Sequence, residues 1–317
     1  MRVLVIGSAG FIGEALVARL VSGAKVGGSE HAVSQLTLLD RRSERPARHG
    51  QVRALEGDIC DRRTLEDATA GGVDCVFHLA SIPGGAAEQN FELGLQVNLV
   101  ATLEMMEVLR RSGTCPRLVF ASTIAVYGVP MPDVIDEDLA PSPSMSYGTQ
   151  KLIGELLIND YGRRGFVDGR AVRIPGIVAR PPAPGMLSIF LSELIRELSA
   201  GRPFICPVAA DAPSWWLSRP GVVDSLVQAS NLGADIVRTQ RSFLLPAMRL
   251  TIAEVVAAIG RVTGRDTAAL VRYQPDAQLQ AQFANYPPMR VPKALAAGFR
   301  HDGSADALVT RALETFP

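Results

Sequence analysis

Two side chains suited to acid-base chemistry stand one helical turn apart in the segment SYGTQKLIGELL. Tyr147 and Lys151 are four residues apart, and on a helix this spacing puts both on one face. A phenol with a pKa of about 10 is a poor proton acceptor at neutral pH, but a neighbouring ammonium stabilises the phenolate. The pair is therefore a candidate general base. The spacing alone also fits two exposed residues on a helix whose apolar face is formed by Leu152, Ile153, Leu156 and Leu157.

Composition limits the possible partners. The chain has 317 residues, 47% of them hydrophobic, with 32 Lys and Arg against 32 Asp and Glu. This balance gives no overall field that would attract nucleic acid or an anionic membrane, so we expect a small-molecule partner. The expected fold has a substantial buried core.

Cysteine usage and the chain start indicate a compartment. Cys60, Cys75, Cys115 and Cys206 are widely scattered, so neither a disulfide framework nor a metal site is expected. The opening MRVLVIG lacks the charged and apolar regions of a signal peptide, and no apolar run reaches the roughly 18 residues of a membrane span. We expect a cytoplasmic protein with no membrane partner.

Strand-like and helix-like segments alternate along the first half of the chain. The expected strands are RVLVIG, QLTLLD, VRALEGDI, VDCVFHLA, PRLVFAS and GRAVRIP, and the expected helices include residues 11–23, 61–70, a long one from Glu88 to Arg111, and one beginning at Tyr147. This order predicts an α/β fold with a doubly wound parallel sheet. After Pro175 the chain is rich in Pro and Gly and its elements are shorter. We therefore expect a dinucleotide-binding domain at 1–176 and a smaller, mixed substrate-binding lobe at 177–317, some elements of which pack on the first domain.

A glycine-rich turn joins the first strand to the first helix. In GSAGFIG, Gly7, Gly10 and Gly13 are spaced three and three. Glycine lets the backbone approach a pyrophosphate closely, and the amides and dipole at the helix start favour the negative charge. The spacing differs by one residue from the usual two and three, but its place between a strand and a helix is the one this mechanism requires.

An acidic residue ends the second strand. A carboxylate at Asp40 can accept hydrogen bonds from the ribose hydroxyls of NAD and would repel the 2′-phosphate of NADP. The arginines that follow in DRRSERPARHG, at positions 41, 42, 45 and 48, form either a solvated loop or a phosphate clamp. The strand end favours NAD.

These motifs together resemble the extended short-chain dehydrogenase/reductase superfamily of NAD-dependent epimerases and dehydratases. GSAGFIG matches its glycine motif, HLAS its fourth-strand motif, and VFASTIAVYG followed by YGTQK its active-site segments. Within the superfamily, the segment from Ser146 to Pro181 resembles the D-erythronate dehydrogenases, which oxidise a four-carbon sugar acid at C2 with NAD. The resemblance implies a Rossmann fold, a homodimer and NAD-dependent oxidation of a secondary hydroxyl of a small sugar acid.

The resemblance also implies roles for single residues. Tyr147 would be the general base, Lys151 would lower its pKa and hold the nicotinamide ribose, and Thr123 would hydrogen-bond the reacting oxygen, with Ser122 as the alternative. The remaining expected cofactor contacts are Gly7, Gly10, Phe11, Ile12, Gly13, Asp40, Asp58, Ile59, Leu79, Ala80, Ser81, Asn98 and Pro175.

Several alternatives remain at this point. Sugar-nucleotide dehydratases place an Asp-Glu pair after the residue matching Thr123, where this chain has Ile124 and Ala125, so elimination is disfavoured. A nucleotide-sugar epimerase stays open, and a protein that only senses NAD would have no need of the tyrosine, lysine and threonine together.

The second lobe offers two candidate ligands for a substrate carboxylate. Arg180 and Arg219 stand beside prolines, and the planar guanidinium suits a carboxylate. Trp215 and Trp216 either wall off a small pocket or belong to the core. Apolar positions in LGLQVNLVATLEMMEVL beyond those one sheet contact uses predict a dimer interface formed by the long helix and the helix after Tyr147.

Overall fold

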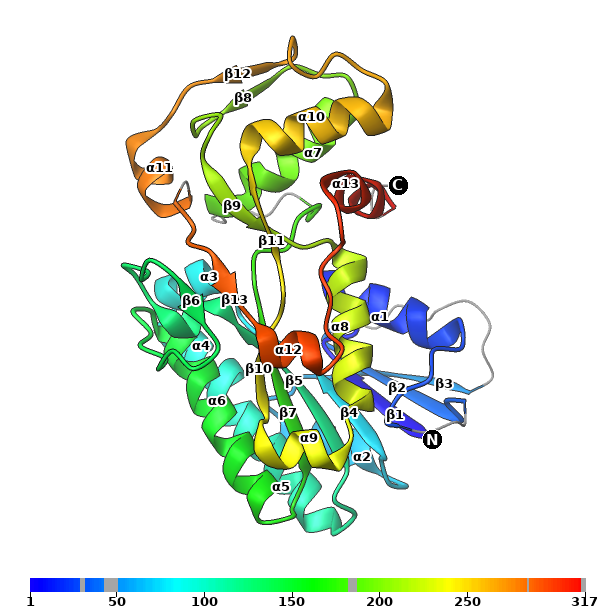
Figure 1. The fold of residues 1–317 in the computed structure, drawn as a ribbon. Helices are drawn as coiled ribbons and strands as arrows, with labels where there is room; N and C mark the ends of the chain where they lie inside the picture. Colours follow the sequence, from blue (N-terminus) through cyan, green and yellow to red (C-terminus); the bar gives the residue numbers. More distant parts are fainter. Residues whose placement is uncertain (29–31, 43–50, 182–186, 284, 315–317) are drawn as a thin grey trace. The chain divides into compact units, whose positions relative to one another are not determined.

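The computed structural model describes residues 1–28, 32–42, 51–181, 187–283 and 285–314. The chain forms two compact units (Figure 1). The first comprises Met1–Val129, Ala140–Ile174 and Val223–Leu244, and the second comprises Pro130–Leu139, Pro175–Val222 and Leu245–Pro317. The predicted domains, 1–176 and 177–317, remain a prediction. The two compact units do not coincide with these ranges, since Val223–Leu244 groups with the first unit.

A seven-stranded parallel sheet forms the centre of the first unit. Its order is β10-β7-β5-β4-β1-β2-β3, and every neighbouring pair is parallel. The strands are β1 (Arg2–Ile6), β2 (Gln35–Asp40), β3 (Val52–Glu56), β4 (Cys75–His78), β5 (Arg117–Thr123), β7 (Asp168–Ile174) and β10 (Ser242–Leu244). The strand order reverses between β1 and β4, where doubly wound sheets bind ligands at the carboxyl ends of their strands. The predicted α/β class is confirmed.

Helices flank this sheet (Figure 1). They are α1 (Phe11–Val21), α2 (Arg62–Thr69), α3 (Gly84–Gln89), α4 (Phe91–Gly94), the π-helix η1 (Leu95–Val100), α5 (Ala101–Ser112), the 3₁₀ turn η2 (Ile124–Tyr127), α6 (Ser146–Arg163), α9 (Ala234–Thr239) and α8 (Arg219–Asn231), which the chain enters from the second unit. One core cluster joins α2, α5 and α6 to the sheet through residues such as Leu65, Met106, Ile158, Leu4 and Phe120.

The predicted long helix from Glu88 to Arg111 is wrong as one continuous element. Asn90 has a φ of −134° and its side chain accepts from the Leu93 amide, which separates α3 from α4. Asparagine competes for backbone amides in this way, and apolar periodicity does not reveal it. The π-helical turn at Leu95–Val100 then shifts the register before α5.

Two strands also differ from expectation. The strand predicted as VRALEGDI ends at Glu56, because Asp58 turns the chain by accepting from the Cys60 amide. The three-residue strand β10 was not expected from the sequence. It pairs with β7 at the edge of the sheet.

The second unit is smaller and mixed, as predicted. Its strand pairs are β6 (Ile135–Asp136) with β13 (Met289–Arg290), β8 (Phe204–Cys206) with β12 (Val271–Tyr273), and the antiparallel β9 (Pro213–Trp216) with β11 (Met248–Thr251). Its helices are η3 (Leu187–Ile189), α7 (Phe190–Ser199), α10 (Ile252–Thr263), α11 (Ala277–Phe283), α12 (Pro292–Ala296) and α13 (Ala305–Leu313). A core cluster packs α7, α10 and α13 together.

Helix α10 shows how the sequence sets an element boundary. Thr251 and Glu254 form a reciprocal capping box at its start, and Gly264 ends it in the left-handed conformation. In the part of the chain that the structure describes, no helix is long and apolar enough to cross a membrane.

Candidate functional site

The loop after β1 closes tightly because three of its residues lack a Cβ. Gly7 has a φ of +86°, and a Cβ there would lie 2.6 Å from the Ala80 nitrogen. A Cβ on Gly13 would lie 2.0 Å from the Gly7 carbonyl oxygen. The loop therefore brings the start of α1 against β1 and the end of β4. This cradle fits a pyrophosphate.

Helix α1 begins without a side-chain cap. Gly10, its N-cap, supplies no side-chain hydrogen bond, so first-turn N–H groups such as that of Ile12 are not capped by that residue. An anion at this helix start would accept from them and would face the positive end of the helix dipole.

Asp40 ends β2 beside this loop. Its Oδ2 accepts from the Ala9 amide at 2.9 Å, so one oxygen of the carboxylate fixes the loop conformation. Arg41 and Arg42, which follow, are exposed, while positions 45 and 48 lie outside the described residues. After β3, Asp58 accepts from the Cys60 amide and Ile59 is buried. The predicted ribose and adenine ligands thus follow neighbouring strands.

The segment after β4 is held from both sides. The Leu79 and Ala80 amides donate to the Ile6 carbonyl, which keeps the stretch leading to Ser81 against β1. Asn98, fully buried in the π-helix, accepts from the Ile82 amide at 2.7 Å and donates to the Ile82 carbonyl at 3.1 Å. Its amide also donates to Gln150 at 2.8 Å. Asn98 is a brace between this segment and α6.

Tyr147 lies in the first turn of α6. A Cβ on Gly84 would be 3.5 Å from the Tyr147 ring, so α3 packs directly against the phenol. The α6 N-cap, Met145, supplies no side-chain hydrogen bond, and the Ser146 amide instead donates to Glu88 of α3 at 2.5 Å. This cap could not be expected from the sequence, because the two residues are 58 positions apart along the chain.

Lys151 is buried one turn after Tyr147. Its residue exposure is 1%, and its Nζ lies 4.6 Å from the centre of the Phe120 ring and 5.8 Å from that of Tyr147. Burial lowers the pKa of Lys151 to about 7. The predicted pair therefore shares one face of the helix, and its amine is removed from water.

His78, at the end of β4, is not a second base. Burial, and then the charge of Lys151, lower the pKa of His78 to about 3. Its Nε2 lies 2.8 Å from the Thr102 hydroxyl, which itself donates to the Asn98 carbonyl. The imidazole is thus neutral at pH 7. Its Nε2 donates to the Thr102 hydroxyl, because that hydroxyl uses its own proton for the Asn98 carbonyl.

Ser122 and Thr123 are consecutive in β5, so their side chains leave opposite faces of the strand. The Ser122 hydroxyl donates to Glu155 at 2.5 Å. The Thr123 hydroxyl accepts from the Ala125 amide at 3.2 Å and caps η2. A Cβ on Gly148 would be only 2.3 Å from the Ala125 carbonyl oxygen, so the first turn of α6 contacts the turn that Thr123 begins.

The remaining predicted residues belong to the second unit. Pro175 follows β7 and is buried, whereas Arg180 and Arg219 are half-buried. Trp215 and Trp216 are core residues, 1% and 0% exposed, and their indole N–H groups donate to the carbonyls of Pro287 and Leu250. Among the described residues, no group of His, Cys, Asp or Glu side chains is arranged to hold a metal ion.

A parallel sheet with a glycine cradle at its switch point and a tyrosine-lysine pair beside it defines a dinucleotide-dependent enzyme. Residues 3–212 match the model of the NAD dependent epimerase/dehydratase family. The chain belongs to this family, and its cofactor is NAD.

Two curated relatives match nearly the whole chain. It is 38% identical to a D-erythronate dehydrogenase of Cupriavidus necator, over 99% of this chain and 98% of the relative. It is 31% identical to one of Haemophilus influenzae, over 99% of each. Among solved structures, a protein from Agrobacterium tumefaciens described as a nucleoside-diphosphate-sugar epimerase superposes with a TM-score of 0.91, at 33% identity, covering 99% of this chain and 94% of the other.

The burial of Lys151 predicts a pH-dependent change in stability. Lys151→Met should raise the free energy of unfolding of the cofactor-free protein near neutral pH, because the variant no longer buries an ammonium. Between the folded pKa of about 7 and the ordinary 10.5, the unfolded lysine holds a proton that the folded one lacks. The destabilisation is therefore full below pH 7, shrinks as the pH rises and is absent above about 10.5.

Urea denaturation at several pH values measures this gain. Lys25→Met, which changes an exposed lysine of the same unit, is the control and should show no such trend. A gain that is absent, or that stays constant from about pH 6 to pH 10, contradicts the burial of a protonatable amine at position 151.

Proposed function

We propose that this enzyme oxidises the C2 hydroxyl of a small sugar acid of the D-erythronate type, with NAD as the hydride acceptor. The observation that carries the proposal is the buried Lys151 one turn from Tyr147, together with whole-length relatives named D-erythronate dehydrogenase. We assign the fold's dinucleotide cradle and this pair to one site.

In the proposed reaction, Tyr147 removes the proton of the substrate hydroxyl. The positive charge that Lys151 carries when protonated stabilises the phenolate. Thr123 donates a hydrogen bond to the reacting oxygen, and we prefer it to Ser122 because the Ser122 hydroxyl is committed to Glu155. Bound NAD supplies the acceptor for the hydride from C2. The products are a 2-keto acid, the reduced cofactor and a proton.

The carboxylate of such a substrate needs a cationic partner. Arg180 and Arg219 are our candidates, since both are half-buried and a guanidinium can bind a carboxylate through two parallel hydrogen bonds. Glu or Asp at either position would repel the substrate.

A nucleotide-sugar epimerase is the second candidate function. It is favoured by the similarity to the Agrobacterium protein described as a nucleoside-diphosphate-sugar epimerase. The discriminating experiment incubates the enzyme with NAD and either C4 sugar acids or nucleotide sugars and follows NADH absorbance. Net NADH formation with a sugar acid supports the dehydrogenase. Conversion of a nucleotide sugar without net NADH formation supports the epimerase.

Tyr147→Phe should abolish turnover while leaving NAD affinity nearly intact, because it removes only the proton acceptor. General-base catalysis contributes roughly 10²- to 10⁴-fold. If the variant retained activity within about tenfold of the wild type, the assignment of Tyr147 as the general base would be contradicted. Tyr161→Phe is a matched control on the same helix, since that hydroxyl donates to Glu107 at 2.6 Å and has no assigned role in the reaction. Steady-state kinetics and NAD titration measure both variants.

The cofactor preference follows from charge at Asp40. A carboxylate near the ribose opposes the dianionic 2′-phosphate of NADP, so we expect NAD to be preferred by at least about a hundredfold in kcat/KM, each tenfold being about 1.4 kcal/mol. Asp40→Asn should shrink this ratio, because the amide oxygen can still accept from Ala9 while the charge is lost. Asp40→Ala should shrink the ratio too, and it should weaken NAD binding because alanine cannot accept a hydrogen bond from the Ala9 amide or the ribose. If Asp40→Asn leaves the ratio unchanged, the following arginines determine it.

We further propose that the enzyme is a homodimer formed through α4, η1, α5 and α6. These helices of the first unit expose Phe91 (59%), Leu93 (39%), Val100 (38%), Leu103 (36%) and Leu156 (59%). Apolar side chains gathered on neighbouring helices fit a self-complementary interface with a second copy.

Leu156→Glu should therefore dissociate the dimer, because it places a charge in an apolar contact. Light scattering at micromolar concentration measures the mass. Ile205→Glu is the control, as Ile205 is equally exposed, at 59%, on β8 of the other unit. A wild-type protein that is already monomeric contradicts the proposal.

A further inference from the structure

A buried ion pair joins α6 to β7 in the first unit. The side chains of Glu155 and Arg173 are 2% and 10% exposed. The Arg173 Nε lies 3.1 Å from each carboxylate oxygen, and its Nη2 lies 2.7 Å from Oε2. The Ser122 hydroxyl donates to Glu155 Oε1 at 2.5 Å, and Arg173 Nη1 donates to the Tyr127 hydroxyl at 2.7 Å. We call these four residues the carboxyl-end network.

The four residues lie in β5, η2, α6 and β7, which either carry Thr123, Tyr147 and Lys151 or directly adjoin the strand that carries Thr123. Ser122 directly precedes Thr123, and Tyr127 ends the 3₁₀ turn η2 that Thr123 caps. Glu155 stands one helical turn after Lys151 on α6. Arg173 is the penultimate residue of β7. The carboxyl-end network thus fixes the ends of two strands, one turn and one helix against each other.

The chemistry of the carboxyl-end network suits it to holding its elements in place more than to stabilising the fold. Removing two charges from water costs several kcal/mol per ion in real proteins, and apolar replacements of such pairs are often neutral or stabilising. The Glu155–Arg173 pair does fix the orientation of α6 relative to β7, because a guanidinium and a carboxylate bind each other in one plane. Removal of one hydroxyl from it leaves the pair intact but frees one of the attached elements.

We propose that the carboxyl-end network is a positioning device for the reaction, which holds Thr123 in register with Tyr147 and Lys151. Ser122 fixes the strand on one side of Thr123, and Tyr127 fixes the far end of η2 on the other side. This rests on the role proposed for Thr123, whose hydroxyl must reach the reacting oxygen within hydrogen-bond distance. None of the four residues is proposed to touch the substrate.

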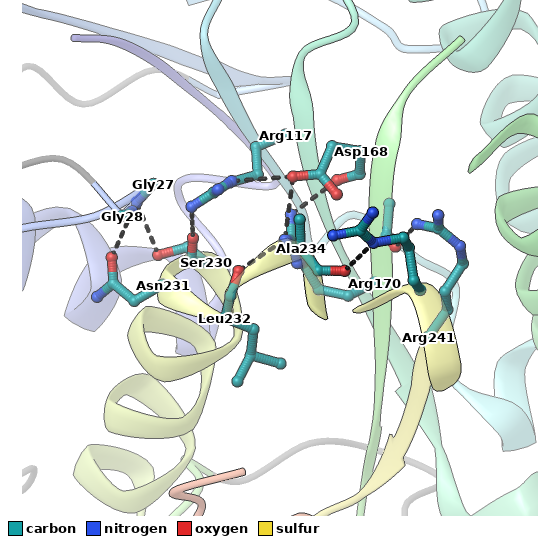
Figure 2. A network of polar contacts seen from close by, with 12 residues as sticks. Gly27, Gly28, Arg117, Asp168, Arg170, Ser230, Asn231, Leu232, Ala234 and Arg241 are labelled. Carbon is teal, nitrogen blue, oxygen red and sulfur yellow. Dashed lines mark hydrogen bonds and ion pairs between the residues drawn. The ribbon is translucent and has the colours of Figure 1, made fainter. Parts of the chain in front are cut away.

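The opposite ends of the same strands carry a second polar network, which provides a natural comparison (Figure 2). Arg117 on β5 lies 3.0 Å from Asp168 and donates to the Ser230 carbonyl at 2.8 Å. Arg170, with a fully buried side chain, donates to Asp168 and to the Leu232 carbonyl. Figure 2 shows these arginines meeting the carbonyl end of α8.

We call the contacts of Arg117, Arg170 and Asp168 with the end of α8 the amino-end network. This network has a structural explanation. Positive side chains at a helix carboxyl end satisfy carbonyls that have no partner within the helix. It holds the segment Val223–Leu244 to the sheet at the strand ends remote from Thr123. Arg170 and Arg173 are three residues apart on one strand, so the two networks can be compared in the same protein.

The test uses variants that remove a single oxygen. Tyr127→Phe and Ser122→Ala should each lower kcat by about tenfold, with KM for NAD within about twofold, since a displacement of about 1 Å can cost roughly a hundredfold. Ser230→Ala is the matched control, because its hydroxyl accepts from Gly27 and donates to Val227 in the amino-end region. It should leave kcat within about twofold.

A second comparison controls for loss of stability. Arg173→Met leaves the buried Glu155 carboxylate without its cationic partner, and Arg170→Met removes a buried guanidinium from the partly exposed Asp168. Loss of one partner is destabilising, so both variants should lower the unfolding midpoint. Only Arg173→Met should lower kcat, when both are assayed well below that midpoint. Equal losses of kcat would overturn the proposal.

The decisive readout is a double-mutant cycle with Thr123→Ala. If Tyr127 and Ser122 act through the Thr123 hydroxyl, their substitutions should change kcat by less than about twofold once that hydroxyl is absent. The same tenfold loss in the Thr123→Ala background would show a general structural effect and overturn the positioning role. Full activity of Thr123→Ala itself would instead overturn the role assigned to Thr123, so the two failures are distinguishable.

Discussion

The removal of one amine from water is the constraint on which the site depends. Lys151 is buried against the Phe120 ring at 4.6 Å, and an aromatic face attracts a cation by about 1 to 2 kcal/mol. Desolvation outweighs that attraction, since the pKa of Lys151 falls to about 7. The lysine can therefore gain or lose a proton near neutral pH, at 5.8 Å from the centre of the Tyr147 ring.

This burial requires α6 to lie close to β5. A Cβ on Gly154 would be 2.8 Å from Phe120 Cζ, and a Cβ on Gly148 would be 2.3 Å from the Ala125 carbonyl oxygen. Two glycines on one helix thus allow the backbone of α6 to approach the strand end and its following turn. This contact places the turns of α6 that carry Tyr147 and Lys151 against β5 and η2.

Close backbone approach at glycines also forms the loop after β1, which we propose binds the cofactor. Gly7 and Gly13 permit backbone contacts that no other residue would allow, and Asp40 fixes the loop through the Ala9 amide. Asn98 then joins the segment after β4 to Gln150 of α6. A continuous set of contacts therefore runs from the glycine-rich loop to the helix that carries the tyrosine and lysine.

The fold class and the order of the main elements could be predicted from the amino-acid sequence alone. Apolar strands alternate with amphipathic segments, and each glycine, cap and spacing is a local signal, so GSAGFIG, Asp40 and the Tyr147–Lys151 pair were all recognisable along the chain. The interruption at Asn90 and the π-helix were not, because the apolar periodicity of Glu88–Arg111 continues across both. Nor was β10, since three residues carry too little pattern to identify an edge strand.

Which polar groups contact one another could be known only from the folded chain. The hydroxyl of Ser122, the alternative to Thr123, donates to Glu155, which is why we prefer Thr123 in the proposed reaction. Trp215 and Trp216 are buried in the core, a placement that the sequence left open. The partners of Ser122, Asn98 and the α6 amino end come from residues distant along the chain. Local sequence encodes propensity and spacing, whereas such pairings depend on which strand ends and helix turns the folded sheet brings together.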